Sequence, residues 1–135
     1  MRSRTALVAL AVLPVLAACG SGGAGGAAGE PCGALPTADP AATLPGGFPA
    51  LPGQVLYGPA TQGKTSVVFG LLPREDFVAV RDELVDGLEK AGYQVVGTDQ
   101  EAVEAEAEFA GPHEGTVKVQ PLCAGHLTVR YKVTG

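Results

Sequence analysis

Residues 73–93 read PREDFVAVRDELVDGLEKAGY and decide the fold, because their apolar side chains follow the period of an α-helix. Successive apolar residues are three or four positions apart, which places them on one side of a helix: Phe77, Val80, Leu84, Leu88 and Ala91, widened by Val78 and Val85. The other side is polar and is expected to face water, with Arg81, Asp82, Glu83, Asp86, Glu89 and Lys90 on it. The segment therefore predicts one amphipathic helix.

Both ends of this helix carry sequence signals. Pro73 suits the first turn, and Glu75 and Asp76 follow where the helix dipole is positive. Lys90, followed by a glycine, marks the C-terminal end. Gly87 lies inside the helix and costs about 1 kcal/mol relative to alanine, which we explain by a close approach of the helix to the sheet.

The segments on either side of the helix favour β-strands. Residues 54–57 and 65–71 are rich in valine, tyrosine, phenylalanine and threonine, and the glycines and proline between them predict a hairpin. After the helix we expect four more strands, over residues 93–99, 101–109, 116–120 and 126–133. Residues 101–109 also suit a helix by composition, but the strict alternation of glutamate with apolar residues favours a strand.

Charged side chains alternate along three of these expected strands. They are Glu104, Glu106 and Glu108 in one strand, and Lys118, Arg130 and Lys132 in the two that follow. Opposite charges on neighbouring strands relieve the repulsion within the row of glutamates. We therefore predict an α+β fold with a small, mostly antiparallel sheet and one amphipathic helix packed on one face.

Residues 58–65, GPATQGKT, match the nucleotide-binding pattern G-x-x-x-x-G-K-[ST] letter for letter. That pattern binds phosphate where a helix begins at the lysine, because the amides of the first turn surround the anion. Here the residues after Thr65 favour a strand, and Asp99 is a poor partner for magnesium. We therefore predict no nucleotide binding, and we interpret Gln62, Gly63 and Lys64 as the tip of the hairpin.

The N-terminus has the order of an export signal. Arg2 and Arg4 give a cationic start, residues 6–16 form an apolar run too short to span a membrane, and the run ends in Leu16, Ala17, Ala18 and Cys19. This order resembles the signal peptide and lipobox of bacterial lipoproteins, in which the cysteine receives the lipid. The layout of the remainder loosely resembles small uncharacterised lipoproteins of GC-rich Gram-positive bacteria, which implies no activity.

The lipobox resemblance implies cleavage before Cys19 and acyl chains on that residue, with about 0.8 kcal/mol contributed by each buried methylene. The mature protein would be exported and anchored to the outer face of the cell membrane. Loss of Arg2 and Arg4 with the leader changes the formal net charge from −5 to −7, which disfavours nucleic acid as a partner.

We divide the chain of 135 residues into four parts. They are a signal peptide over 1–18, the lipidated cysteine with a flexible glycine- and alanine-rich linker over 19–30, a proline-rich extended arm over 31–53, and an α+β domain over 54–135. The linker reaches less than about 20 Å, so the domain is expected close to its membrane.

The two remaining cysteines, Cys32 and Cys123, are expected to pair, because an exported protein meets an oxidising environment. The bond would close a loop of about 90 residues, to which the chain-entropy model assigns about 4 to 5 kcal/mol. The alternative is a redox or metal site built from Cys123-Ala-Gly-His126, for which the sequence offers no second ligand motif nearby.

No group of residues predicts catalysis. A hydrolase would need Ser66 or a carboxylate to meet His113 or His126. The glutamates of 101–109 lack the glycine-bearing loop that would wrap a calcium ion, so a solvated face is the favoured interpretation. We therefore expect no enzyme activity, no cofactor and no metal.

We expect a monomeric, non-catalytic binding or interaction module of the cell envelope, held by its acyl chains, whose partner is an envelope protein or a small ligand. One alternative is a carrier or sensor of a small apolar ligand, with a cavity beneath the apolar stripe of residues 77–88. Phe48 and Tyr57 fit either a ligand groove or the core. The other alternative is an extracytoplasmic hydrolase.

Overall fold

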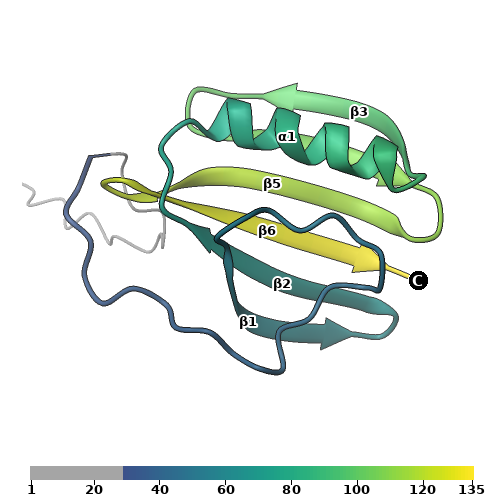
Figure 1. Cartoon of the computed structure of the whole chain (residues 1–135), viewed down its shortest axis with the longest axis horizontal. Helices are drawn as coiled ribbons and strands as arrows, with labels where there is room; N and C mark the ends of the chain where they lie inside the picture. Colours follow the sequence, from purple (N-terminus) through teal and green to yellow (C-terminus); the bar gives the residue numbers. More distant parts are fainter. Residues whose placement is uncertain (1–28) are drawn as a thin grey trace, which may run out of the picture.

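The computed structural model describes residues 29–135, which form one six-stranded antiparallel sheet and one helix (Figure 1). The strand order is β1-β2-β6-β5-β4-β3. The elements are β1 (Val55–Gln62), β2 (Thr65–Leu72), α1 (Phe77–Lys90), β3 (Gln94–Gln100), β4 (Ala105–Ala110), β5 (Glu114–Cys123) and β6 (His126–Thr134). The predicted fold class is confirmed. The lipobox with Cys19 lies outside the described residues.

Helix α1 is capped at both ends by its own sequence. The side chain of Asp76 accepts a hydrogen bond from the amide of Ala79 at 2.9 Å, so the helix starts after Asp76 and Pro73 precedes it. The prediction that Pro73 lies in the first turn is therefore wrong. At the other end Gly92 has φ 87°, and the helix stops before Ala91, which is exposed and lies outside the buried stripe that we predicted.

Helix α1 covers only half of one sheet face, namely β3, β4 and β5. The last part of the proline-rich arm covers the other half and crosses β6 and β2 on the side that carries α1 (Figure 1). Its Phe48 is 7% exposed and meets the rings of Tyr93, Phe109 and Tyr131 edge-on, at centroid distances of 5.5, 5.4 and 5.9 Å. Phe48 is therefore a core residue.

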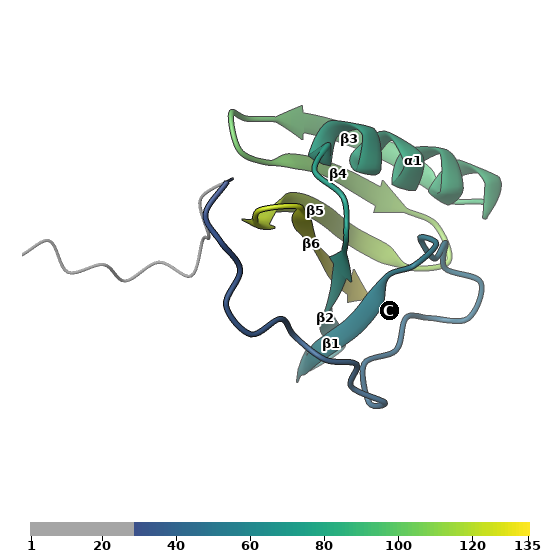
Figure 2. The ribbon, with the colours of Figure 1, turned by 60° about the vertical axis from the view of Figure 1, so that its left-hand side comes forward.

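The arm also lies along the open edge of β1, where the amide of Asp39 donates to the carbonyl of Leu56 at 2.9 Å. Figure 2 shows the arm on the β1 side of the sheet, with α1 lying over β3 and β4. Such a hydrogen bond occupies part of an edge that would otherwise be free to pair with another chain.

Gly87 makes room for the proline-rich arm and not for the sheet. A Cβ atom at this position would lie 2.8 Å from Cβ of Pro49, a contact that real side chains do not make. The glycine thus lets the helix approach the arm, which corrects our interpretation of a close contact between helix and sheet.

Arg81 corrects the predicted polar side of the helix, because it is only 9% exposed. Its Nη1 donates to the carbonyl of Asp99 at 3.1 Å, and its Nε lies 2.6 Å from Oδ1 of Asp82. The helix lies close enough to β3 that the flank of its polar side meets the end of that strand. The hydrogen bonds satisfy the guanidinium group there.

Three strands differ from the prediction by more than one residue at an end. Strand β5 runs from Glu114 to Cys123, where we expected residues 116–120. Strand β1 continues past Tyr57 to Gln62 through a bulge at Gly58 and Pro59, which an edge strand tolerates because Pro59 has no amide to pair. Residues 101–104 form a turn, closed by a hydrogen bond from the amide of Glu101 to the carbonyl of Glu104 at 2.8 Å. Strand β4 therefore begins only at Ala105.

Candidate functional site

The sheet face that carries no helix has an ordered pattern of charges. We call it the helix-free face. In the strand register, one row crosses all six strands from β3 to β1: Asp99, Glu106, Lys118, Arg130, Phe69 and Tyr57. Two acids, two bases and two aromatic rings thus follow one another in order.

The neighbouring row of the helix-free face has a similar order of side chains. It runs through Gly97, Glu108, Thr116, Lys132 and Val67 on successive strands from β3 to β2. The helix-free face therefore has an acidic strip on β3 and β4, a basic strip of Lys118 on β5 with Arg130 and Lys132 on β6, and an apolar strip on β2 and β1. Glu114, at the start of β5, is the exception to this order.

The acidic and basic strips meet at Lys118. Its Nζ lies 2.8 Å from Oε1 of Glu104 and 3.4 Å from Oε2 of Glu106, so Lys118 relieves the row of glutamates as predicted. Arg130 and Lys132 do not, because β6 is not a neighbour of β4. The hydrogen bond with Glu104 is the main cause that raises the pKa of Lys118. Arg130 and Lys132 are exposed and form no ion pair with any residue of 29–135.

The apolar strip carries the second of the two aromatic residues singled out from the sequence. The ring of Tyr57 stacks on that of Phe69 at a centroid distance of 5.6 Å, and its hydroxyl forms a 2.8 Å hydrogen bond with Oγ1 of Thr128. Tyr57 thereby covers Thr128, which is buried although it lies on the helix-free face. Both rings remain half-buried.

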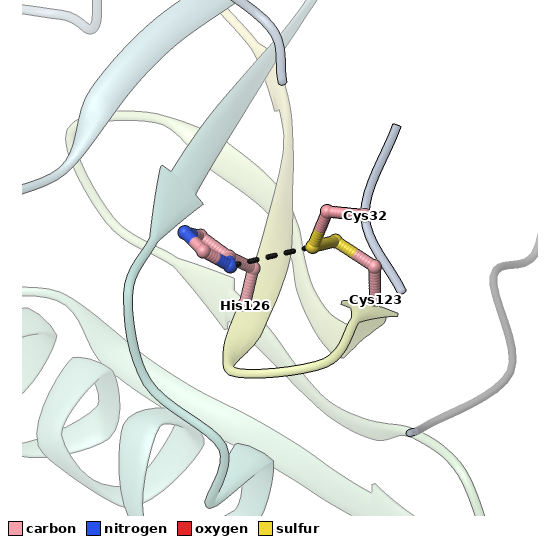
Figure 3. A group of neighbouring side chains, drawn as sticks. All are labelled: Cys32, Cys123 and His126. Atoms are coloured by element: carbon pink, nitrogen blue, oxygen red, sulfur yellow. Dashed lines mark hydrogen bonds between the residues drawn. A yellow bond between two sulfur atoms is a disulfide. The ribbon is translucent and has the colours of Figure 1, made fainter. Parts of the chain in front are cut away.

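A sulfur–imidazole cluster lies at the end of the sheet where β5 turns into β6 (Figure 3). Cys32 and Cys123 form the predicted disulfide, with their Cα atoms 5.1 Å apart. His126 directs Nδ1 towards Cys32 Sγ at 3.5 Å and towards the carbonyl of Ala124 at 3.2 Å. The metal ligands of the alternative interpretation therefore do lie together, but the disulfide uses both of their sulfurs, so neither Cys32 nor Cys123 offers a thiolate to a metal.

The remaining residues singled out from the sequence lie apart. Lys64 is exposed in the β1–β2 turn beside Gly63, and a strand follows it, which confirms the hairpin tip. His113 precedes β5 and His126 follows it, so the two histidines lie at opposite ends of that strand. Among the hydrogen bonds of residues 29–135, none joins either histidine to a serine or a carboxylate.

The space beneath the helix is filled by side chains. Val80, Leu84 and Leu88 of the apolar stripe are fully buried, and they share one cluster with Phe48 from the arm and Phe109 from the sheet. This is the place where a carrier would need its cavity.

One buried polar pair was not found from the sequence. The hydroxyl of Tyr131 donates to Oε1 of Gln54 at 2.6 Å, and burial raises the pKa of this tyrosine. A Cβ atom at Gly70 would lie 2.8 Å from the same oxygen, so the glycine in β2 makes room for the pair. The glycine within a strand pattern was the available sequence signal.

No protein-family model, curated protein or solved structure matches this chain. Among the described residues, no helix is both long and apolar enough to cross a membrane.

Proposed function

We propose that the protein is an exported lipoprotein, anchored to the outer face of the cell membrane through acyl chains on Cys19, and that it serves as a non-catalytic binding module. The observation that carries the binding role is the helix-free face, where Arg130 and Lys132 stand exposed without a carboxylate partner among residues 29–135. Cations beside a half-buried aromatic pair favour contact with another molecule over a purely solvated surface.

The export part of the proposal is supported by the disulfide between Cys32 and Cys123. Such bonds persist in oxidising compartments and are rare in the cytosol. The amide of Ala124 also donates to the carbonyl of Glu30 at 2.7 Å, which fixes the start of the arm at the β5–β6 turn. The linker predicted from the sequence would then hold this end of the sheet near the membrane.

A carrier of a small apolar ligand is less well supported. Its ligand would have to lie beneath Val80, Leu84 and Leu88, where the aromatic ring of Phe48 already packs. A hydrolase would require one of the histidines to meet a nucleophile, whereas His126 faces a disulfide. The binding module requires neither a cavity nor such a pair.

Metabolic labelling with a fatty-acid analogue tests the anchor. We expect the wild-type protein to carry the label and to sediment with membranes, and Cys19→Ala to lose both properties because only sulfur forms the thioether. Ser21→Ala is the matched control, since it changes a neighbouring small residue and should keep the label. An unlabelled wild-type protein that retains residues 1–18 would contradict the proposal.

A further inference from the structure

We propose that the helix-free face binds a second copy of this chain, with the acidic strip of each copy against the basic strip of the other. The inference deepens the proposed function, because it names the partner of the binding face, and it replaces the monomer that we expected from the sequence. It follows from the spacing of charges along two strands. Glu106 and Glu108 of β4 lie in the same two rows as Arg130 and Lys132 of β6, with one strand between them.

Two sheets that face each other can be related by a two-fold axis that runs along β5. Such an axis keeps each row at its level and exchanges β4 with β6. Glu106 then faces Arg130 of the second copy, and Glu108 faces Lys132 of the second copy. Symmetry doubles these contacts, so the interface contains four pairs of opposite charge.

The centre of this interface is compatible with close approach. Lys118 lies on the axis and would meet Lys118 of the second copy. Its charge is already balanced, because Glu104 and Glu106 lie 2.8 and 3.4 Å from its Nζ. Thr116, next to it on the same face of β5, adds no charge. Glu114, the first residue of β5, also lies on the axis and would meet Glu114 of the second copy, which sets one unfavourable pair against the four favourable ones.

The other two-fold axis in the plane, which runs across the strands, is unfavourable. It places each strand opposite itself, so acid would meet acid and base would meet base. It would also direct the Glu30 ends of the two copies in opposite directions. The axis along β5 leaves both Glu30 ends at the β5–β6 turn side, so both tethers point towards one membrane.

The size of the contact predicts a weak dimer. Five strands spaced about 4.8 Å apart and about 20 Å of their length give a footprint of about 500 Å² per copy, or about 1,000 Å² in total. This is the lower limit for a specific interface. Anchoring both copies in one membrane raises their effective concentration, and we expect stable pairing there.

The test uses the full-length chain in its membrane, with a photo-crosslinking amino acid in place of Thr116. A residue on the two-fold axis should crosslink to its own counterpart and give a product of twice the mass. The same amino acid in place of Glu89, which is exposed on α1, is the control that should give no such product. Absence of the dimer from the Thr116 position, or crosslinking there to a different protein only, would overturn the inference.

A charge exchange tests the pairing itself. The acidic variant Arg130→Glu/Lys132→Glu and the basic variant Glu106→Arg/Glu108→Lys should each crosslink to themselves about tenfold less than wild type, because like charges then face each other. Co-expression of the two variants should restore the dimer, since each supplies the charge that the other needs. The control Lys64→Glu/Lys90→Glu changes the net charge by as much as the acidic variant does. Its substitutions lie away from the helix-free face, so it should leave the dimer unchanged.

Failure of the anchor is distinguished from failure of the pairing by the full-length Cys19→Ala chain. At high concentration in low salt it should still sediment as a reversible dimer, and the acidic variant in this background should sediment as a monomer. If the Cys19→Ala chain stays monomeric at all concentrations while the fatty-acid label is present on wild type, the anchor holds and the pairing is wrong. Charge variants that form the dimer as well as wild type does would also contradict the proposed pairing.

Discussion

The two faces of the sheet have opposite chemistry although the same strands supply both. On one face Val117, Val129 and Tyr131 are fully buried beneath α1 and the arm. On the other face their sequence neighbours Lys118 and Arg130 reach solvent. The contrast teaches that one sheet can separate two tasks: the covered face supplies the free energy of folding, and the helix-free face is the one that we propose for contact.

Loss of the disulfide should have the largest effect on this contrast. Removing both sulfurs with Cys32→Ala/Cys123→Ala frees the start of the arm that covers half of the buried face. The chain-entropy model for a separation of 91 residues gives a loss of about 4 to 5 kcal/mol in the free energy of unfolding. Denaturant titration with circular dichroism measures it. An unchanged midpoint would show that the arm is held without the bond.

Phe48→Ala should cost about 3 to 5 kcal/mol, because it removes the ring that joins the arm to the sheet and leaves a cavity. Phe69→Ala is the matched control, since this ring lies on the helix-free face, is half-buried and should cost clearly less. The same denaturant titration compares them. If both variants lose the same free energy of unfolding, the proposed energetic difference between the two faces is wrong.

Gly87→Ala should lower the free energy of unfolding by about 1 to 2 kcal/mol, although alanine is the better helix former. The new Cβ atom would collide with Cβ of Pro49, 2.8 Å away. Combining it with Pro49→Gly removes that carbon, so the double variant should be more stable than Pro49→Gly alone. A stabilising single variant would contradict the close contact of helix and arm.

Tyr131→Phe should cost about 1 kcal/mol at neutral pH, because the hydrogen bond to Gln54 is lost. In wild type, burial raises the pKa of Tyr131 above its ordinary value of 10.0, so the folded state keeps a proton that the unfolded state releases. The stability is therefore complete below pH 10 and falls as the pH rises above it.

Thermal unfolding as a function of pH measures this fall, which should be smaller in Tyr131→Phe than in wild type. Lys118, whose pKa is also raised, contributes a loss of the same sign in every variant. Identical slopes for wild type and Tyr131→Phe above pH 10 would show that the buried hydroxyl does not control the alkaline limit.

The order and type of the elements could be predicted from the sequence because each one depends on its own periodicity. Apolar steps of three and four residues are enough to place α1, and alternation is enough to place β5 and β6. What packs against each element cannot be predicted in this way. Arg81 and Gly87 were misinterpreted because their environment is set by β3 and by Pro49, which lie far away in the sequence.

The candidate site also combines features that could be predicted from the sequence with features that could not. The pairing of Cys32 with Cys123 was predicted from the number of cysteines. The contact of His126 with Cys32 was not predicted, because His126 entered only as part of the alternative metal or redox site. The rows of the helix-free face depend on β2 lying beside β6, a neighbour that is distant in the sequence. Periodicity within single strands cannot reveal that order.

The most direct test of the account compares two quantities in the same variant. The acidic variant Arg130→Glu/Lys132→Glu should change the free energy of unfolding by no more than about 0.5 kcal/mol, because both side chains are exposed. In the membrane it should lose most of the Thr116 crosslink to a second copy. A variant that unfolds more easily yet crosslinks as efficiently as wild type would contradict the separation of folding and binding between the two faces.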